Sequence, residues 1–338
     1  MKAVALKAYL PIDNPQSLLD VELEKPTPQG HDLLVAVRAM SVNPVDTKVR
    51  APKDKHEDQP RVLGWDAVGL VEATGPEVSL FKPGDRVYYA GDITRPGSNS
   101  EYQLVDERIV GRAPLSLSDA EAAALPLTAI TAWEGLFDRL RINRHEDAAK
   151  TLLIVGGAGG VGSIAIQLAK QLTKVTVIAT ASRPETREWC LSLGADQVVD
   201  HSDLLHNMRA VGHEQIDYIF CLNNTEQHWS SMCELIKPQG TICSIVETKH
   251  PVNLTQLQSK SANFVWEFMF TRSMFQTDDM IEQHHLLNEL SELIDTGKIK
   301  TTVTTILSPV NAENLRKAHT QLESSRTIGK VVLEHWPS

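Results

Sequence analysis

The spacing of hydrophobic and polar positions changes near residue 116. Before it, short runs such as 33–39 are interrupted again and again by Pro and Gly. Short runs between such breaks are typical of strands. No segment of residues 1–115 shows the 3.6-residue period of a long helix, so we expect a β-rich, barrel-like domain there.

Beyond residue 116 the pattern becomes helical and then alternates between two kinds of element. Ser118 and Glu121 form a predicted capping box. From residue 151 on, buried runs suited to strands are each followed by an amphipathic stretch suited to a helix, which predicts a doubly wound parallel sheet. The expected strands are 151–155, 174–180, 197–199, 216–221, 240–246, 262–270 and 328–334, and the expected helices are 161–172, 184–193, 203–211, 226–236, 278–296 and 311–324.

The length of the chain indicates two domains. It has 338 residues, whereas single hydrophobic cores stop growing at roughly 250–300 residues. We therefore expect a β-rich domain over 1–125, completed by 273–338, and an α/β domain over 126–272.

Charge and cysteine usage exclude several classes of function. The formal net charge is −10, which argues against a nucleic-acid-binding surface. No apolar run approaches the roughly 20 residues that span a bilayer, so we expect no membrane partner. The four cysteines form no C-x-x-C pair, which argues against structural zinc. We expect reduced thiols in a cytoplasmic protein.

Residues 151–155 lead into a glycine-rich turn with the pattern G-x-G-x-x-G. The first glycine permits a tight turn, the second lets backbone N–H groups approach a pyrophosphate, and the third lets the helix pack closely on the strand. A purely structural glycine turn is the alternative, but the strand–turn–helix context favours a dinucleotide site. The expected cofactor-binding residues of this turn are Gly157, Gly159, Gly160, Val161 and Gly162.

The end of the second strand of this series predicts which dinucleotide binds. An NAD site usually has an acidic residue there, whereas this strand ends in Ser182 and Arg183. A hydroxyl and a guanidinium suit the 2′-phosphate of NADP(H), because Arg offers forked, charge-assisted donors. The alternative is that Arg183 is only a solvated loop charge.

Several longer motifs point to a family. They are Gly-Trp-Asp-x-x-Gly over 64–69, Phe-Lys-Pro-Gly-Asp-Arg-Val over 81–87, Leu-Pro-Leu-Thr-Ala-Ile-Thr-Ala-Trp over 125–133, and the glycine turn. With these motifs the chain resembles the medium-chain dehydrogenase/reductase superfamily from end to end. Residues 41–47 and 329–333 resemble its quinone oxidoreductase branch, and in particular the subgroup labelled "zinc-type alcohol dehydrogenase-like". The resemblance implies a GroES-like barrel domain and a Rossmann domain.

The resemblance also implies that the catalytic zinc is missing. Zinc-dependent members have Cys, His and a further Cys or Asp where this chain has Asn43, Trp65 and Leu127. A catalytic zinc needs three protein ligands and an open position, so we expect no metal. Trp65 would then fill the vacated volume beside the nicotinamide; the alternative is that it points into the core of the β-rich domain.

The remaining site residues are likewise implied by the resemblance. Asn43 is expected to hold the nicotinamide ribose or the substrate oxygen, and Asp46 to orient it. No residue is an evident general acid, so the proton is expected to come from water. The resemblance assigns the pocket to Trp65, Leu127 and Phe268, and further cofactor contacts to Thr131 and Lys330.

These observations together predict an NADPH-dependent, zinc-independent oxidoreductase that transfers hydride to a quinone or an α,β-unsaturated carbonyl. Such acceptors delocalise the incoming charge and need less help than an alcohol does. A zinc-dependent alcohol dehydrogenase with unusual ligands and a non-catalytic NADPH-binding protein are the alternatives. The apolar segment 262–270 predicts a homodimer formed through an edge strand, or else an ordinary core strand.

Overall fold

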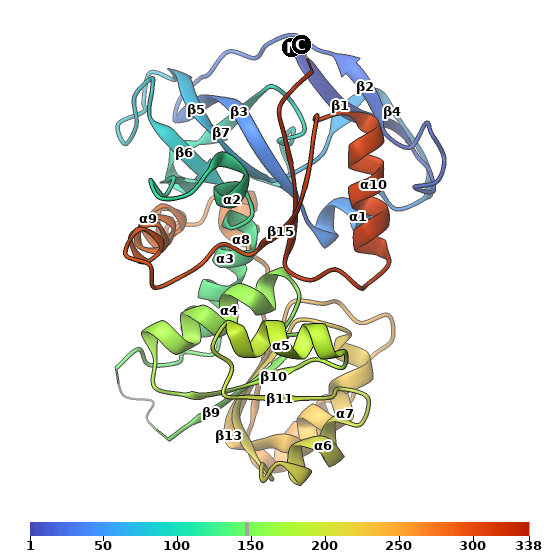
Figure 1. The fold of residues 1–338 in the computed structure, drawn as a ribbon, viewed down its shortest axis with the longest axis vertical. Coiled ribbons are helices and arrows are strands. Elements are labelled where there is room, and N and C mark those ends of the chain that lie inside the picture. The colour runs from blue at the N-terminus through green and yellow to red at the C-terminus, as the bar shows by residue number, and fades with distance from the viewer. Residues whose placement is uncertain (146–148, 338) are drawn as a thin grey trace. The chain divides into compact units, whose positions relative to one another are not determined.

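The computed structural model describes residues 1–145 and 149–337. The chain forms two compact units, one of residues 1–130 with 270–338 and one of residues 131–269 (Figure 1). The units divide after residues 130 and 269, whereas the sequence analysis set the divisions after residues 125 and 272. None of the helices in the described residues is long and apolar enough to cross a membrane.

The β-rich unit contains two sheets. The smaller has the order β2-β1-β4, and the larger has the order β15-β16-β3-β5-β6-β8, with β7 also paired to β3. The strands are β1 (Lys2–Tyr9), β2 (Leu19–Glu22), β3 (Asp32–Val42), β4 (Lys53–Val62), β5 (Asp66–Thr74), β6 (Arg86–Tyr89), β7 (Tyr102–Asp106), β8 (Val110–Arg112), β15 (Val303–Leu307) and β16 (Lys330–Glu334). In the register, β5 and β16 flank the end of β3 on opposite sides, so three distant segments meet there.

Three short helices of this unit, at 44–50, 107–109 and 271–275, lie where the sequence predicted none. The helices of this unit are α1 (Pro44–Arg50), η1 (Glu107–Ile109), α2 (Asp119–Ala123), α8 (Thr271–Phe275), α9 (Glu282–Asp295) and α10 (Ala312–Glu323), and α3 (Pro126–Trp133) runs across the boundary. The prediction of an all-β segment over 1–115 was wrong at η1 and at the longer α1. This helix has only 7 residues, too few to show a helical period.

The α/β unit is a parallel sheet with the order β11-β10-β9-β12-β13-β14, which confirms the Rossmann-type fold class. Its strands are β9 (Thr151–Val155), β10 (Thr176–Thr180), β11 (Gln197–Val199), β12 (Ile216–Cys221), β13 (Ile236–Ser244) and β14 (Asn263–Trp266). Its helices are η2 (Glu134–Arg139, a π-helix), α4 (Gly160–Leu172), α5 (Pro184–Ser192), α6 (Leu204–Ala210), α7 (Thr225–Leu235) and η3 (Leu254–Lys260). The expected strand over 262–270 is shorter, because the chain leaves β14 after Trp266.

A row of fully buried side chains crosses the middle of this sheet. Ile178 of β10 lies opposite Leu153 of β9, which lies opposite Ile219 of β12, which lies opposite Ile242 of β13. All four belong to one hydrophobic core and are 0% exposed. Strands buried on both faces read as continuous apolar runs, which is why the sequence pattern located them well. The carboxyl ends of all these strands share one edge of the sheet.

Candidate active site

The carboxylate of Asp66 lies at the centre of a buried hydrogen-bond cluster in the β-rich unit. Its Oδ2 atom accepts hydrogen bonds from the Ser41 hydroxyl at 2.6 Å and from the Asn43 side-chain amide at 2.7 Å. Its Oδ1 atom accepts from the backbone N–H of Leu127 at 2.7 Å. Leu127 lies in the first turn of α3, where helical N–H groups have no partner within the helix. The pairing of the strands and the first turn of α3 thus supply hydrogen-bond donors to a carboxylate that is buried away from solvent.

The ammonium group of Lys330 completes this cluster. It donates to the backbone oxygen of Val42 and to Asp66 Oδ2, both at 3.1 Å, and to Asn43 Oδ1. An ammonium group has three N–H donors, and here three protein oxygens accept from it. The cofactor contact that the resemblance implies for Lys330 stays a prediction, and it would have to replace one of these bonds.

Asn43 and Asp46 are held by the first turn of α1. Asn43 is the N-cap of this helix, Pro44 is its first residue, and the Asp46 carboxylate accepts from the backbone N–H of Asn43. Lys330 binds the oxygen of the Asn43 amide and Asp66 binds its nitrogen, so the orientation of the amide is fixed. No acceptor is recorded within the described residues for the second N–H of that amide, and Asn43 is 1% exposed.

Asp46 is a titratable group with an unusual environment. Burial raises its pKa from 3.8 to about 7, although the Asn43 N–H and the Lys330 ammonium oppose this and Asp66 adds to it. One of its oxygens, Oδ1, accepts no hydrogen bond from the described part of the chain. Asp46 can therefore gain or lose a proton near neutral pH, which the sequence did not reveal.

Trp65 packs inside the β-rich unit. Its side chain is 1% exposed, its indole N–H donates to the backbone oxygen of Asp92 at 3.1 Å, and its ring makes an edge contact with Phe270 at 6.0 Å between centroids. This placement favours the alternative in which Trp65 belongs to the core of its own domain. Its expected role beside the nicotinamide stays a prediction.

The residues at the three zinc-ligand positions do not fit a catalytic zinc. Trp65 and Leu127 have no side-chain atom that binds a metal, and the side-chain oxygen of Asn43 already accepts from Lys330. In residues 1–145 and 149–337, no group of three or more His, Cys, Asp and Glu side chains is arranged to hold a metal. The absence of bound zinc itself stays a prediction.

The glycine turn of the α/β unit fits a dinucleotide phosphate. A Cβ at Gly162 would lie 2.4 Å from the backbone oxygen of Gly156, and one at Gly157 would lie 2.8 Å from the side chain of Ala179. At Gly159, the N-cap of α4, the nearest atom would be 3.7 Å away, and no side chain caps the helix. The first N–H groups of α4 are thus open to an anion.

The two arginines that follow β10 differ in what they bind. Arg187 donates to the backbone oxygen of Val198 at 2.8 Å, so the fold already uses it. Arg183 is the N-cap residue of α5, and its guanidinium lies 3.3 Å from the exposed carboxylate of Glu185. A surface ion pair of this kind is weak, and a phosphate can displace it. The neighbouring Ser182 is exposed.

Two further predicted site residues also lie in the α/β unit. Thr131 is 5% exposed within α3, and Phe268, just after β14, is 45% exposed. The sequence prediction missed Asp66 and Ser41 as polar site residues, although both stand in the motifs it used. The signal was an acidic residue flanked by apolar strand positions, which demands buried donors.

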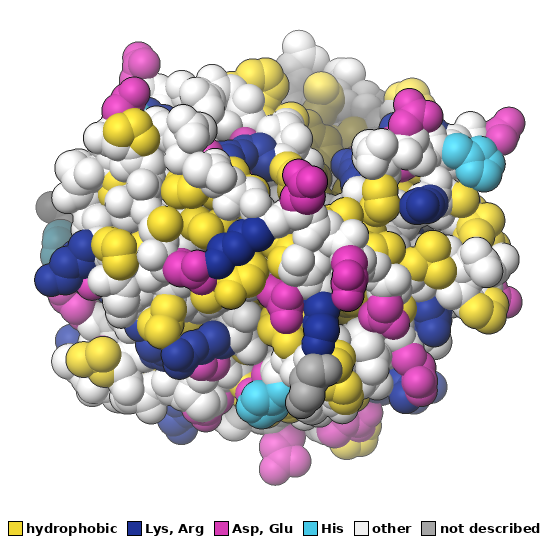
Figure 2. Space-filling model, turned by 90° about the horizontal axis from the view of Figure 1, so that it is seen from above, with side chains coloured by type: hydrophobic (Ala, Val, Ile, Leu, Met, Phe, Trp, Pro, Cys, Tyr) yellow, Lys and Arg dark blue, Asp and Glu magenta, His cyan; other side chains and the backbone are white. Residues whose placement is uncertain are grey.

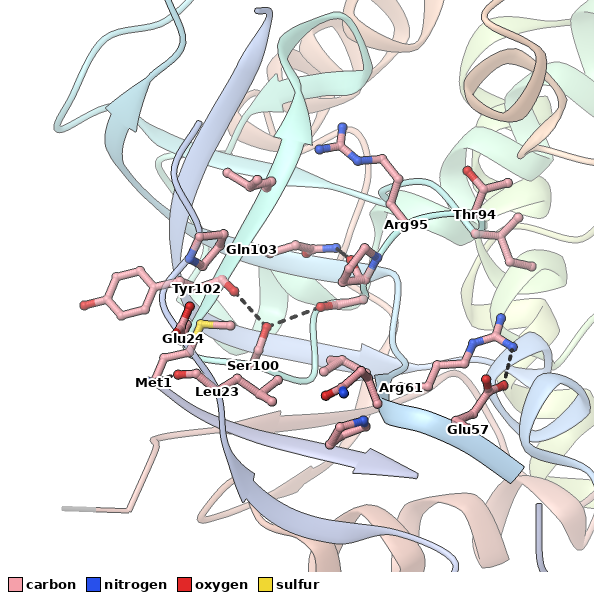
Figure 3. A pocket seen from close by; sticks show the side chains of 18 of the residues that line it. Met1, Leu23, Glu24, Glu57, Arg61, Thr94, Arg95, Ser100, Tyr102 and Gln103 are labelled. Atoms are coloured by element: carbon pink, nitrogen blue, oxygen red, sulfur yellow. Dashed lines mark hydrogen bonds and ion pairs between the residues drawn. The ribbon is translucent and has the colours of Figure 1, made fainter. Parts of the chain in front are cut away.

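A cavity of about 570 Å³ lies elsewhere in the β-rich unit. Figure 3 shows its charged and polar lining, which includes Glu57, Arg61 and Arg95. Residues of β4 and of the segment 93–97 line it, but none of the Asp66 cluster does. The cavity is therefore separate from the cluster. On the face drawn in Figure 2, Lys and Arg side chains are interspersed with Asp and Glu.

The comparisons with known proteins agree with this architecture. Residues 29–115 match the family model of the alcohol dehydrogenase GroES-like domain, and residues 193–333 match that of a zinc-binding dehydrogenase. A zinc-type alcohol dehydrogenase-like protein of Staphylococcus aureus (strain Mu50) is 46% identical over 336 residues, 98% of this chain and 99% of the relative. A 2-methylene-furan-3-one reductase of Solanum lycopersicum is 30% identical, covering 94% of this chain and 76% of the relative.

Solved structures extend the likeness to three dimensions. A Rhizobium etli CFN 42 protein, provisionally described as a zinc-dependent alcohol dehydrogenase, has a TM-score of 0.96 at 52% identity, over 100% of this chain and 99% of that one. The Escherichia coli quinone oxidoreductase complexed with NADPH has a TM-score of 0.83 at 25% identity, over 99% of this chain and 100% of that one. The chain therefore belongs to the medium-chain dehydrogenase/reductase superfamily of oxidoreductases, among its zinc-type alcohol dehydrogenase-like proteins.

Proposed function

We propose that the protein transfers a hydride from NADPH to a quinone or an α,β-unsaturated carbonyl compound without using zinc. The observation that supports this most directly is the position of Lys330. Its ammonium donates to the side-chain oxygens of Asn43 and Asp66, so the lysine already occupies the oxygens that could bind a cation there. Alcohol oxidation relies on a Lewis acid to stabilise the alkoxide, whereas quinones and enones spread the incoming charge themselves.

In this proposal the residues of the Asp66 cluster hold one hydrogen-bond donor, the side-chain amide of Asn43, in a fixed orientation. When bound, the cofactor supplies the hydride. The free N–H of Asn43 donates to the oxygen on which negative charge develops, and Asp66 and Lys330 keep that amide from turning. A donor fixed in advance stabilises developing charge without reorganisation. Asp46 holds the backbone of Asn43, and the proton comes from solvent.

The cofactor is proposed to be NADP(H). The glycine turn leaves room for a pyrophosphate at the N-terminus of α4. No acidic residue ends β10, and Arg183 follows it, with its guanidinium 3.3 Å from the exposed carboxylate of Glu185. The NADPH bound to the Escherichia coli quinone oxidoreductase is consistent with this choice, and the enone in the name of the tomato relative is consistent with the proposed acceptor.

The test is turnover measured by NADPH oxidation. Quinones, enals and enones are supplied one at a time, with and without a metal chelator, and alcohols are supplied with NADP⁺ in parallel. We expect NADPH oxidation with electrophilic acceptors and no effect of the chelator. Alcohol oxidation that is lost with the chelator would favour a zinc enzyme. Tight NADPH binding without any turnover would favour a non-catalytic binding protein.

We further propose that the protein is a homodimer joined through β14. This strand ends the sheet of the α/β unit, so one of its edges has no neighbouring strand within the described residues. Trp266 and Phe268 are 49% and 45% exposed beside that edge. Exposed apolar edge strands tend to pair with another chain, and a second copy of this strand is a suitable partner.

A further inference from the structure

Two glutamates of the α/β unit are buried against each other and have no part in the function proposed above. Glu134 begins η2 and is 0% exposed; Glu267 follows β14 directly and is 2% exposed. Both carboxyl groups lie beside the same guanidinium, and one oxygen of each, Glu134 Oε2 and Glu267 Oε1, accepts no hydrogen bond from the described part of the chain. Arg139, at the other end of η2, donates to Glu267 at 2.9 Å and lies 3.9 Å from Glu134.

This arrangement requires a shared proton. One guanidinium can balance one carboxylate, and two buried carboxylates beside the same guanidinium cannot both ionise cheaply. Burial and the neighbouring Glu134 raise the pKa of Glu267 to about 9, although Arg139 opposes this. The other titratable group recorded beside Glu267 is the Cys243 thiol of β13, whose pKa is also raised by burial. At neutral pH the pair therefore holds one proton.

Glu267 is buried where its neighbours are not. Trp266 and Phe268 on either side are 49% and 45% exposed, so the extended chain turns only Glu267 inward. The helix that bears its partners cannot move away easily, because η2 packs on β12. A Cβ at Gly135 would lie 2.3 Å from the ring of Phe220. The pair thus ties the chain beyond β14 to a fixed element.

The contact between Glu267 and Arg139 lies near the carboxyl ends of the strands of the parallel sheet. The backbone N–H of Glu267 donates to the oxygen of Ser244, the last residue of β13, at 2.9 Å. In doubly wound sheets a dinucleotide lies across this edge, with one nucleotide over each half of the sheet. The glycine turn and Arg183 follow β9 and β10, while β14 lies three strand spacings from β9 on the other side, about 14 Å away.

We propose that Glu267, clamped by Glu134 and Arg139, is a positioning residue for the nicotinamide half of the cofactor. The hydrogen bond from Arg139 to the Glu267 carboxylate, together with the bond from the Glu267 N–H to Ser244, fixes the backbone just past β13 and β14, which borders the second half of the sheet edge. A hydrophobic side chain at 267 would fill the same space at less cost in desolvation, but it would leave this backbone untied. The inference rests on the cofactor of the proposed function.

The test compares NADPH with 2′-phospho-ADP-ribose, which lacks the nicotinamide ring. Affinities of both are measured by calorimetry for the wild type, Glu267→Leu and Glu267→Gln. We expect Glu267→Leu to bind NADPH roughly tenfold more weakly and the fragment within about twofold of wild type. Glu267→Gln should stay close to wild type for both, because its amide can donate to Glu134 and accept from Arg139.

Equal losses for both ligands, or no loss for either, would overturn the inference. A wild type that binds neither ligand would instead contradict the proposed cofactor. Should Glu267→Leu fail to fold, infrared spectra of the wild type and Glu267→Gln still decide whether the clamp exists. Both proteins carry Asp46→Asn in addition, because Asp46, with its pKa of about 7, would contribute a band of its own. The band of a protonated carboxyl group present at neutral pH with Glu267 should then be lost with Glu267→Gln, and its persistence would refute the shared proton.

Discussion

The ammonium of Lys330 lies 3.1 Å from the carboxylate of Asp66, and both side chains are buried in the β-rich unit. The two residues come from β16 and β5, strands that flank β3 on opposite sides. Each buried charge is compensated by the other, and the two side chains together fix the orientation of the Asn43 amide. Removing one partner leaves an uncompensated buried charge.

Replacing Lys330 tests this dependence. Lys330→Met should lower the free energy of unfolding by about 3–5 kcal/mol, the usual effect of breaking a buried ion pair. The measurement is urea denaturation at pH 7. Lys317→Met is the matched control, since Lys317 is 57% exposed and pairs with Glu313 on the surface of α10; it should change stability by less than about 1 kcal/mol. Similar small losses for both variants would contradict the assigned role of the cluster.

Asp46 should make stability depend on pH in a defined direction. Its pKa is 3.8 when unfolded and about 7 in the fold, so the folded state binds more protons between these values. The protonated carboxyl group stabilises the fold below about pH 4, and this contribution is lost as the pH rises to 7. The free energy of unfolding falls by roughly 4 kcal/mol at most over this range. Asp46→Asn stays neutral throughout. The difference in unfolding free energy between wild type and variant should therefore shift against the wild type from pH 4 to 7.

The sequence located the sheet well and the polar cluster poorly, for a physical reason. Apolar runs such as 151–155 report burial locally, so β9 to β13 could be found from pattern alone. The role of Asp66 as a buried hydrogen-bond acceptor depends on the pairing of β3 with β5, which places Ser41 opposite it. No local sequence pattern encodes that pairing. The helix α1 was predictable, because Asn43, Pro44 and Asp46 form an N-terminal capping sequence. The shared proton of Glu134 and Glu267 depends on residues 133 positions apart in the chain.

The purified protein should hold well under one zinc per chain after dialysis without added metal. The reason is chemical: Asn43 is engaged by Lys330, and Trp65 and Leu127 have no ligand atoms. Elemental analysis gives the content directly. One zinc per chain, together with activity lost to a chelator, would contradict both the metal assignment and the proposed reaction.

A dimer through β14 predicts a mass near twice 37.4 kDa in light scattering. Placing a charge in the middle of that strand, by Val265→Asp, should produce monomers, because an edge strand that pairs with another copy does not tolerate repulsion there. Ile306→Asp is the control: Ile306 is 48% exposed on β15, which ends the larger sheet of the β-rich unit. A wild type that is monomeric at micromolar concentration, or a dimer unaffected by Val265→Asp, would exclude this interface.

Arg183 should determine the preference for NADPH over NADH. A charge-assisted hydrogen bond contributes about 1.5–3 kcal/mol, so Arg183→Ala should weaken NADPH binding roughly tenfold to a hundredfold. NADH binding should hardly change, because that cofactor has no phosphate for the guanidinium to bind. Arg187→Ala is a poor control, since Arg187 holds the backbone of Val198. Arg209→Ala is a better one, because Arg209 pairs only with the exposed residues Glu214 and Glu234 in the recorded ion pairs. Equal weakening of NADPH and NADH binding by Arg183→Ala would mean that Arg183 supports the start of α5 and does not bind the phosphate. A wild type that prefers NADH would contradict the assignment of the residues after β10 to the 2′-phosphate of NADP(H).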